Sequence, residues 1–419
     1  MPGDAPGPRG EAVNRFARIF LPFAAGHFLS YLFRSVNAVI AGDLEADVGV
    51  GASELGLLTA SYLLAFALFQ LPLGILLDRL GPRRVESVLL LIAGLGALVF
   101  ALGQGLLSLT VGRALIGLGV SACLMASLKA FALWYRSDQL PAINGYLLAV
   151  GGLGAITATA PAEAMLGVTT WRALFVGLAT GCLLTAAAMW LAVPERGGGV
   201  PAEPLRRQLA GLVFILRSGR FWRFAPAAML FPGGLMAIQG LWAGPWLRDV
   251  AGFDRGMVAH YLLMLAIATT VGFAAWGHLT SRLARRGIDM LRVISVGLVL
   301  FCATVALLAW QPGYGLLATW LVMGFASTSG ALFYAALSRQ FEPELMGRVV
   351  TALNLMVFLG AFGLQWGMGI IIEFPDAPAG EGYAQGGYQA AFGVTAALQA
   401  AALVWLLWPA RRHEPIPPR

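Results

Sequence analysis

Long runs of apolar residues, separated by short polar loops, repeat along the whole chain. A helix that crosses a hydrocarbon core of about 30 Å needs about 20 mostly apolar residues. The runs do not alternate apolar and polar positions as the strands of a membrane barrel do. The pattern therefore predicts twelve membrane-spanning helices, at residues 16–40, 54–77, 85–106, 108–134, 140–165, 171–193, 222–247, 256–281, 289–310, 314–338, 347–373 and 387–408.

The composition agrees with a chain that lies mostly in lipid. Hydrophobic residues make up 58% of the 419 positions and charged residues only 12%, whereas a soluble domain carries roughly 25% charged residues. The 53 glycines are typical of membrane helices, where small residues let neighbouring helices approach closely. The composition therefore excludes a soluble enzyme and predicts an all-α integral membrane protein.

The formal net charge of +7 comes from arginines that gather in alternate loops. Because short cytoplasmic loops are enriched in Arg and Lys, this asymmetry places both termini in the cytoplasm and the chain in an inner (plasma) membrane. Topology accounts for the positive charge, so no nucleic-acid partner is expected. The opposite loops contain Asp43, Glu45, Asp47, Glu54, Asp376 and Glu381, with Arg248 and Arg255 as the main exceptions.

The longest connection on the arginine-rich side divides the chain into two equal sets of spans. Residues 194–221 begin with a Pro/Gly-rich stretch and continue as an apolar and basic run that predicts a helix on the membrane surface. Six spans return the chain to the same side, so both halves have the same orientation, as in parallel transporter repeats. We expect a tail (1–15), a six-helix bundle (16–193), this linker (194–221), a second six-helix bundle (222–408) and a tail (409–419).

Ordered motifs in the loops and the fourth span carry a family resemblance. Residues 74–84 read Gly-Ile-Leu-Leu-Asp-Arg-Leu-Gly-Pro-Arg-Arg, and a second copy that lacks the acid begins at Gly277. Together with Arg113 and Gly117 in the fourth span and Trp171-Arg172 at the start of the sixth, this resembles the major facilitator superfamily. The resemblance implies twelve helices in two parallel six-helix pseudo-repeats and solute transport by alternating access. The motif residues are Gly74, Asp78, Arg79, Gly81, Arg83, Arg84, Arg113 and Gly117.

The loop motif also has a physical interpretation. Gly74 lets the second span pack closely, and Asp78 meets a helix N-terminus or an arginine. Arg79, Arg83 and Arg84 face anionic lipid headgroups. The resemblance implies that this loop latches the two halves together in one access state, and the alternative is that its charges are topology signals only.

A polar stripe in the first span gives the main substrate-site prediction. His27, Tyr31 and Arg34 share one helix face with Ser30 and Asn37, and such a face meets a cavity or a partner rather than lipid. The segment resembles the first span of the family's organic-anion carriers, whose arginine contacts the substrate anion. In the alternative, Arg34 extends to the outer headgroups.

Other polar groups inside the spans are weaker candidates for the same site. Lys129, the only lysine, either faces the cavity or extends to the nearby interface. Amide and aromatic groups in the second half would shape a pocket, although helix–helix contacts are at least as good an explanation. These residues are Gln239, Trp242, Asn354 and Gln365.

Met236, His260 and Met264 allow a different interpretation. Thioether and imidazole groups bind Cu(I), and the pattern resembles a copper-importing bacterial branch of the same superfamily. Methionine is also a common packing residue, so we predict no metal site and keep copper as an alternative.

No phosphate-binding loop, nucleophile elbow or metalloprotease helix is present, so we expect neither an enzyme nor a cofactor. Transport would then use an ion gradient or the substrate's own gradient, with His27 as the most central side chain that titrates near neutral pH. The favoured function is import of a small organic anion by a monomer in contact with membrane lipid, with protons as a possible second partner. A copper importer, a drug or metabolite exporter and a non-transporting sensor are the alternatives.

Overall fold

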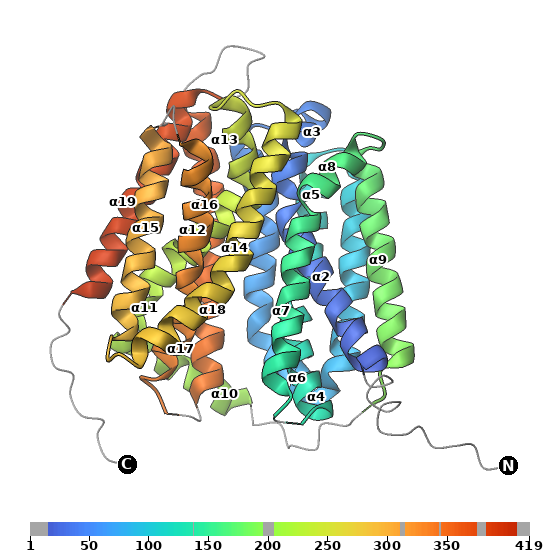
Figure 1. The fold of residues 1–419 in the computed structure, drawn as a ribbon. Coiled ribbons are helices and arrows are strands. Elements are labelled where there is room, and N and C mark those ends of the chain that lie inside the picture. The colour runs from blue at the N-terminus through green and yellow to red at the C-terminus, as the bar shows by residue number, and fades with distance from the viewer. Residues whose placement is uncertain are drawn as a thin grey trace.

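The computed structural model describes residues 16–136, 138–195, 205–310, 315–342, 345–374 and 383–408. All described elements are helices, and twelve of the resulting segments are long and apolar enough to cross a membrane, so the predicted all-α fold with twelve spans is confirmed. Figure 1 shows two bundles side by side, which we call the first half (residues 16–195) and the second half (residues 205–408).

The first half runs from η1 to α9, and the second from α10 to α19. The elements of the first half are η1 (Phe16–Phe20), α2 (Leu21–Ser35), α3 (Asn37–Val48), α4 (Ala52–Leu102), α5 (Leu106–Val120), α6 (Cys123–Trp134), α7 (Leu140–Thr157), α8 (Ala160–Leu166) and α9 (Trp171–Ala192). Those of the second are α10 (Leu205–Arg217), α11 (Gly219–Leu230), α12 (Pro232–Ala237), η2 (Ile238–Trp242), α13 (Ala243–Asp249), α14 (Arg255–Ala284), α15 (Met290–Trp310), α16 (Leu316–Ser327), η3 (Thr328–Ala331), α17 (Leu332–Ser338), α18 (Met346–Glu373) and α19 (Gln385–Leu407).

Large apolar side chains remain exposed along the outer faces of both bundles. Leu95 and Leu184 in the first half and Val296 in the second are more than half exposed. A soluble monomer rarely exposes contiguous apolar surface on this scale. Lipid contact explains the pattern, as expected for a multi-pass membrane protein.

The second and third spans form one element, α4, with a sharp turn at Gly81. This residue has φ 78° and ψ 159°, a region that is essentially restricted to glycine. The sequence predicts two separate helices, 54–77 and 85–106, and the structure has two helical stretches that meet at the non-helical Gly81. Any side chain at this position would strain the turn.

The first and fourth spans of each half are interrupted, although the sequence predicts them as continuous. The breaks lie at Val36, at Ser121–Ala122, between α11 and α13, and at η3. Pro232 begins α12 without an N–H to donate, while Ser121 and Thr328 donate their hydroxyls to carbonyls three residues earlier. The fifth span is also divided, into α7 and α8. The matching breaks in the two halves agree with the predicted pseudo-repeat.

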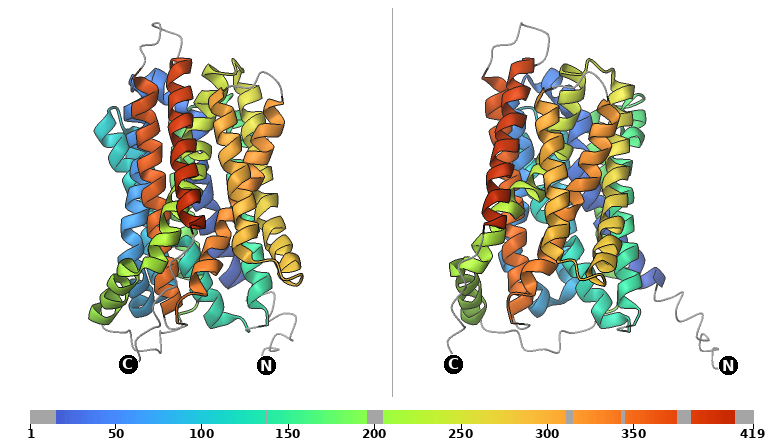
Figure 2. Two further views of the ribbon diagram at one scale, coloured as in Figure 1. Left: turned by 90° about the vertical axis from the view of Figure 1, so that its left-hand side faces the viewer. Right: turned by 60° about the vertical axis from the view of Figure 1, so that its left-hand side comes forward.

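The charged residues distinguish the two ends of the bundle, and we name the ends after them. The acid-rich end holds Asp43, Glu45, Asp47, Glu163 and Asp249 on α3, α8 and α13, at the top of Figure 1. The arginine-rich end holds Arg79, Arg83, Arg84, Arg136 and Arg282. Most of the spans run between these two ends (Figure 2).

Several predictions of domain boundaries fall outside the described residues. These are the two tails (1–15 and 409–419), residues 196–204 of the linker, and the loop acids Asp376 and Glu381. The predicted surface helix is present as α10 at the arginine-rich end (Figure 2), where Gly211 lies against the Arg348 side chain. The division at the linker and the position of α10 on the membrane remain predictions.

Candidate functional site

A cavity of about 350 Å³ lies between the two halves, within the size range of small-molecule sites. Its walls come mainly from the interrupted spans: α2, α5 and α6 in the first half, and α12, α16, η3 and α17 in the second. Helices α4, α14 and α18 complete it. Interrupted helices at the interface of two repeats are where transporters bind their substrates, so this cavity is the candidate substrate site.

Arg34 lines this cavity, held among three aromatic rings. Its guanidinium carbon lies 4.9 Å from the ring centroid of Tyr31, 5.5 Å from that of Phe66 and 5.3 Å from that of Phe358. Among the described residues that line the cavity there is no Asp or Glu. Aromatic faces attract the cation without neutralising it, so the guanidinium retains its charge for an anion.

Phe66 and Phe358 close the cavity beside Arg34. Phe66 belongs to the first half and Phe358 to the second, and their rings stack at 4.1 Å between centroids with an interplanar angle of 17°. An aromatic pair of this kind is worth about 0.5–1.5 kcal/mol beyond the area that it buries. The two halves therefore meet directly at the level of Arg34.

The predicted stripe on the first span divides at the break in the helix. His27, Ser30, Tyr31 and Arg34 line the cavity, whereas Asn37 is buried outside its lining. Asn37 follows Val36, where α2 gives way to α3 although the backbone keeps helical angles (φ −63°, ψ −22°). His27 packs edge-on against Tyr31 at 5.0 Å, and its ring nitrogens have no hydrogen-bond partner among the described residues.

Tyr334 and Asn354 form the polar part of the opposite wall. The Tyr334 hydroxyl donates to Asn354 Oδ1 at 2.8 Å, and both residues line the cavity. The sequence predicts Asn354 as a lining residue but not Tyr334. In the sequence, the one local sign that Tyr334 faces a cavity is the Ser/Thr-rich segment just before it in the tenth span. A lone tyrosine in an apolar run is more often a packing residue.

Lys129 does not line the cavity. Its ammonium group pairs with Asp78 of the loop motif, also in the first half, at the arginine-rich end. The expectation of an arginine or helix N-terminus as the partner of Asp78 is therefore wrong. The reason is register: Lys129 on α6 reaches the end of α4, and this alignment of two helices is not visible in either segment alone.

The rest of the loop motif is tied to the end of α9. Arg83 lies over the Trp190 ring at 5.1 Å, and both Arg83 and Arg84 pair with Glu195. Arg79 is exposed. Gly74 is also exposed, with no atom within 4 Å of the place where a Cβ would lie, so the close packing expected of it is absent from this conformation.

Arg113 and Gly117 of the fourth span act within the core of the first half. The Arg113 side chain is fully buried, donates to the Phe33 carbonyl at 3.3 Å and lies between the rings of Phe100 and Phe175. A Cβ on Gly117 would overlap the Tyr62 backbone, so this glycine permits close contact between α5 and α4. The pair supports packing rather than contact with the cavity.

Three residues predicted to contact the substrate lie outside the cavity lining. Trp242 is fully buried and donates its indole N–H to the Gln365 carbonyl at 2.9 Å. Gln365 in turn donates to Thr59 Oγ1 of the first half at 2.6 Å. Gln239 is half-buried and also outside the lining. These contacts match the alternative of helix–helix adhesion.

The candidate copper ligands are not brought together. Met236 lines the cavity, but His260 and Met264 do not, and His260 is exposed. His260 lies within the second turn of α14, on the acid-rich side of the protein. The three candidate ligands therefore do not line one cavity in which a copper ion could bind.

Two arginines of the second half bind acids of the first half at the acid-rich end. Arg255 forms two 2.9 Å contacts with the Asp43 carboxylate and one of 2.8 Å with Glu163. Arg248 contacts Glu45 at 2.9 Å and its neighbour Asp249 at 2.6 Å. These arginines are the two exceptions to the charge asymmetry in the sequence. Positive charges in loops that are otherwise acidic are a sequence signal that these arginines form ion pairs with the neighbouring acids.

Burial affects the acid at the centre of this group. Desolvation raises the pKa of Glu45, which lies on α3 beyond the end of the first span, and the opposing attraction of Arg248 offsets only part of the shift. The Tyr383 hydroxyl and Asp249 also face this carboxyl group.

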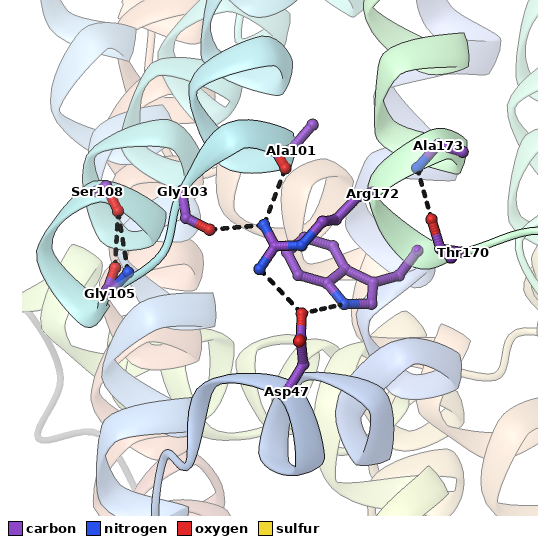
Figure 3. A network of polar contacts seen from close by, with 9 residues as sticks. Asp47, Ala101, Gly103, Gly105, Ser108, Thr170, Arg172 and Ala173 are labelled. Atoms are coloured by element: carbon purple, nitrogen blue, oxygen red, sulfur yellow. Dashed lines mark hydrogen bonds and ion pairs between the residues drawn. The ribbon is translucent and has the colours of Figure 1, made fainter.

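Asp47 forms a separate network at the same end, entirely within the first half (Figure 3). Its carboxylate accepts from Arg172 at 2.9 Å and from the Trp171 indole at 3.2 Å. Arg172 also donates to the carbonyls of Ala101 and Gly103 at 2.9 and 2.6 Å. The Trp-Arg motif thus ties the start of α9 to the ends of α3 and α4.

Glu86 is a buried acid that the sequence did not single out. The side chain is fully buried in the first half, where the Cys123 thiol is its hydrogen-bonding neighbour. It lies against Gly26 of α2 and does not line the cavity. An acid close to the polar end of an apolar run is usually at the interface, so no local signal indicated its burial.

Comparison with known proteins agrees with this architecture. A family model described as Major Facilitator Superfamily matches residues 23–365. The probable sulfoacetate transporter SauU of Cupriavidus necator is 24% identical over 274 residues, which cover 62% of this chain and 64% of that protein. The hexuronate transporter of Bacillus subtilis is 23% identical over 350 residues, which cover 79% of this chain and 82% of that protein.

Solved structures share the fold. A bacterial homologue of the human lysosomal transporter Spinster matches with a TM-score of 0.74 and 18% identity, over 93% of this chain and 95% of that one. The nucleoside transporter NupG matches with a TM-score of 0.72 and 14% identity, over 93% of this chain and 98% of that one. At these identities the likeness concerns the fold alone.

Proposed function

We propose that this chain, which belongs to the major facilitator superfamily and is a transporter rather than an enzyme, imports a small organic anion. Arg34 is the residue that binds the anionic group. Substrate would reach the cavity from one side of the membrane at a time, as the two halves rock about it.

The observation that carries this proposal is an unneutralised guanidinium in a central cavity. A charged group inside a membrane protein is costly and is retained for a function. Arg34 has aromatic faces around it and no carboxylate in the described lining. Its planar fork of donors fits a carboxylate, sulfonate or phosphate, and a bound anion would supply the missing counter-charge.

Two further facts support an anion. The relatives include proteins named for sulfoacetate and hexuronate transport, both organic anions. Two other basic residues inside the spans, Lys129 and Arg113, are held by Asp78 and by the core of the first half. Arg34 is therefore the cation left for a substrate among these three.

The orientation is part of the proposal. With the arginine-rich end in the cytoplasm, the ties of Arg248 and Arg255 lie on the outer side. The cavity lining reaches Leu128, near the end of α6, and Val350, near the start of α18, both toward the arginine-rich end. The conformation would then be one that is closed to the outside.

Variants of Arg34 test the proposal. Arg34→Lys keeps the charge but loses the fork and should weaken binding in part, while Arg34→Gln should nearly abolish it. Loss of a desolvated charge-assisted pair costs about 2–5 kcal/mol, which is tens- to thousands-fold in affinity. The measurement is ligand-induced thermal stabilisation of purified protein across carboxylates and sulfonates, together with uptake into proteoliposomes.

Arg292→Gln is the matched control, because it removes one positive charge from an exposed position on α15. It should leave affinity unchanged. Normal affinity for the anion in Arg34→Gln would contradict the proposal, and Arg34 would then be a residue of packing alone.

A further inference from the structure

We propose that the substrate is a monoanion with an apolar body, such as an aromatic or branched carboxylate or sulfonate, rather than a polyhydroxylated sugar acid. This inference rests on the proposed function, because it assigns the anionic group to Arg34. It concerns the remainder of the cavity, which neither the family nor the named relatives specify for this chain.

Most polar groups in the cavity wall already use their donors within the protein. The hydroxyls of Ser121, Ser327 and Thr328 donate to carbonyls of their own helices at 2.7–2.8 Å. Gln70 donates to the Ser121 carbonyl at 3.1 Å, and Tyr334 donates to Asn354. These four hydroxyl groups can still accept a hydrogen bond, but their own protons are already donated and cannot reach a substrate hydroxyl.

The groups without such an internal bond gather on one side. His27, Ser30, Tyr31 and Arg34 lie on a single face of α2. A sugar acid carries hydroxyls on nearly every carbon, and burying a hydroxyl without a hydrogen bond costs about 1–3 kcal/mol in proteins. The wall outside α2 therefore accepts hydrogen bonds from a substrate but donates few, which favours a charged headgroup over a polyhydroxylated chain.

The rest of the wall is apolar and comes from both halves. Leu124, Met125 and Leu128 of α6 face the cavity from the first half, and Leu235, Met236 and Phe273 from the second. Such a surface favours an apolar substituent, by about 0.8 kcal/mol for each buried CH₂ group. Methionine adapts to ligands of different shapes.

A single charge follows from the cations available in the wall. Arg34 is the one Arg or Lys among the described lining residues. The other basic group of the lining, the His27 imidazole, lies on the same face of α2 as Arg34. A second carboxylate at the opposite end of the ligand would therefore have no cation beside it to offset its desolvation. A dianion is therefore disfavoured relative to a monoanion of the same size.

A ligand series on the full-length purified protein tests the inference. Phenylacetate and cyclohexanecarboxylate provide a charge and an apolar body, glucuronate provides a charge and hydroxyls, and succinate provides two charges. Phenylacetamide keeps the apolar body without the charge. Thermal-shift titration should give half-saturation for phenylacetate at a concentration at least about tenfold lower than for glucuronate or succinate.

The outcomes separate this inference from the proposed function. If glucuronate or succinate binds as tightly as phenylacetate or tighter, the inference is wrong while anion binding stands. If phenylacetamide binds as tightly as phenylacetate, the proposed function itself fails. If none of the five compounds stabilises the protein at about 10 mM, roughly ten times the Kd that corresponds to a binding free energy of about −4 kcal/mol, the inference is also contradicted.

Variants of Met125 give an independent readout. Met125→Gln places a polar group of similar length in the apolar wall and should weaken phenylacetate binding by about tenfold while changing glucuronate binding little. Met125→Leu conserves volume and apolarity and should retain phenylacetate binding. Equal effects of both substitutions on both ligands would contradict an apolar binding wall at α6.

Discussion

The two ends of the molecule use ion pairs differently. At the acid-rich end, Arg248 and Arg255 of the second half bind Glu45, Asp43 and Glu163 of the first. At the arginine-rich end, the pairs formed by Lys129, Arg83 and Arg84 join residues of the first half to one another. One set of charges connects the halves, and the other braces a single bundle.

This difference indicates which interactions must break when the access state changes. Rocking of two rigid bundles leaves pairs within a bundle intact and separates pairs between bundles. The ties at the acid-rich end, the Phe66–Phe358 stack and the Gln365–Thr59 hydrogen bond all join the halves. We call this set of contacts between the halves the closure.

The largest effect on this closure is expected from Arg255→Gln, which removes contacts to two acids at once. Exposed ion pairs are worth about 0–1 kcal/mol each, and Arg255 is 58% exposed, so we expect a shift of about 1 kcal/mol, or about fivefold, toward the state open at this end. Pulsed EPR with spin labels at Ala46 on α3 and Met257 on α14 would report a longer distance, in a background without Cys302. An unchanged distance distribution would show that Arg255 does not hold the halves together.

A smaller effect is expected from Asp43→Asn, for which the chain offers a matched control. Asp43 and Asp47 both lie on α3 and both bind an arginine, but Asp43 binds Arg255 of the second half and Asp47 binds Arg172 of the first. Asp43→Asn should lengthen the distance between the same spin labels. Asp47→Asn should lower the thermal midpoint by a few degrees and leave the distance unchanged, and the same change in both variants would undo the distinction between the two kinds of pair.

The smallest effect is a pH dependence through Glu45. Burial raises the pKa of this carboxyl in the closed state, whereas exposure on opening would return it toward the ordinary value. The closed state therefore binds the proton more tightly, and it is favoured as the pH falls through the raised pKa toward the ordinary pKa of Glu. The same EPR distances, followed from neutral pH to about pH 4, should shift toward closure in the wild type and less in Glu45→Gln. An opposite shift on acidification would mean that the Arg248 contact outweighs desolvation.

The sequence predicts a structural feature correctly where the residues that determine it lie on one helix face or in one loop. The twelve spans follow from apolar length, the turn at Gly81 belongs to an ordered motif, and the placement of Arg34 in the cavity follows from a stripe on one helix. The family resemblance, drawn from these motifs, is also confirmed.

Prediction from the sequence failed where a contact depends on the alignment of separate helices. Lys129 pairs with Asp78 instead of lining the cavity, and Gln365 bonds to Thr59 although 306 positions separate them. Asn37 belongs to the predicted stripe but is buried outside the cavity lining. Asp43 and Arg255 lie 212 positions apart in the sequence. Each charge stands out in its own loop, but the sequence does not show that the two residues form an ion pair with each other.

The binding of the substrate's anionic group by Arg34 is tested most directly by a charge comparison. The affinities of an anion and its neutral amide, phenylacetate and phenylacetamide, are measured for the wild type and for Arg34→Gln by thermal-shift titration. We predict that the wild type prefers the anion by at least about tenfold and that Arg34→Gln loses this preference. A preference for the anion that persists unchanged in Arg34→Gln would contradict this role of Arg34.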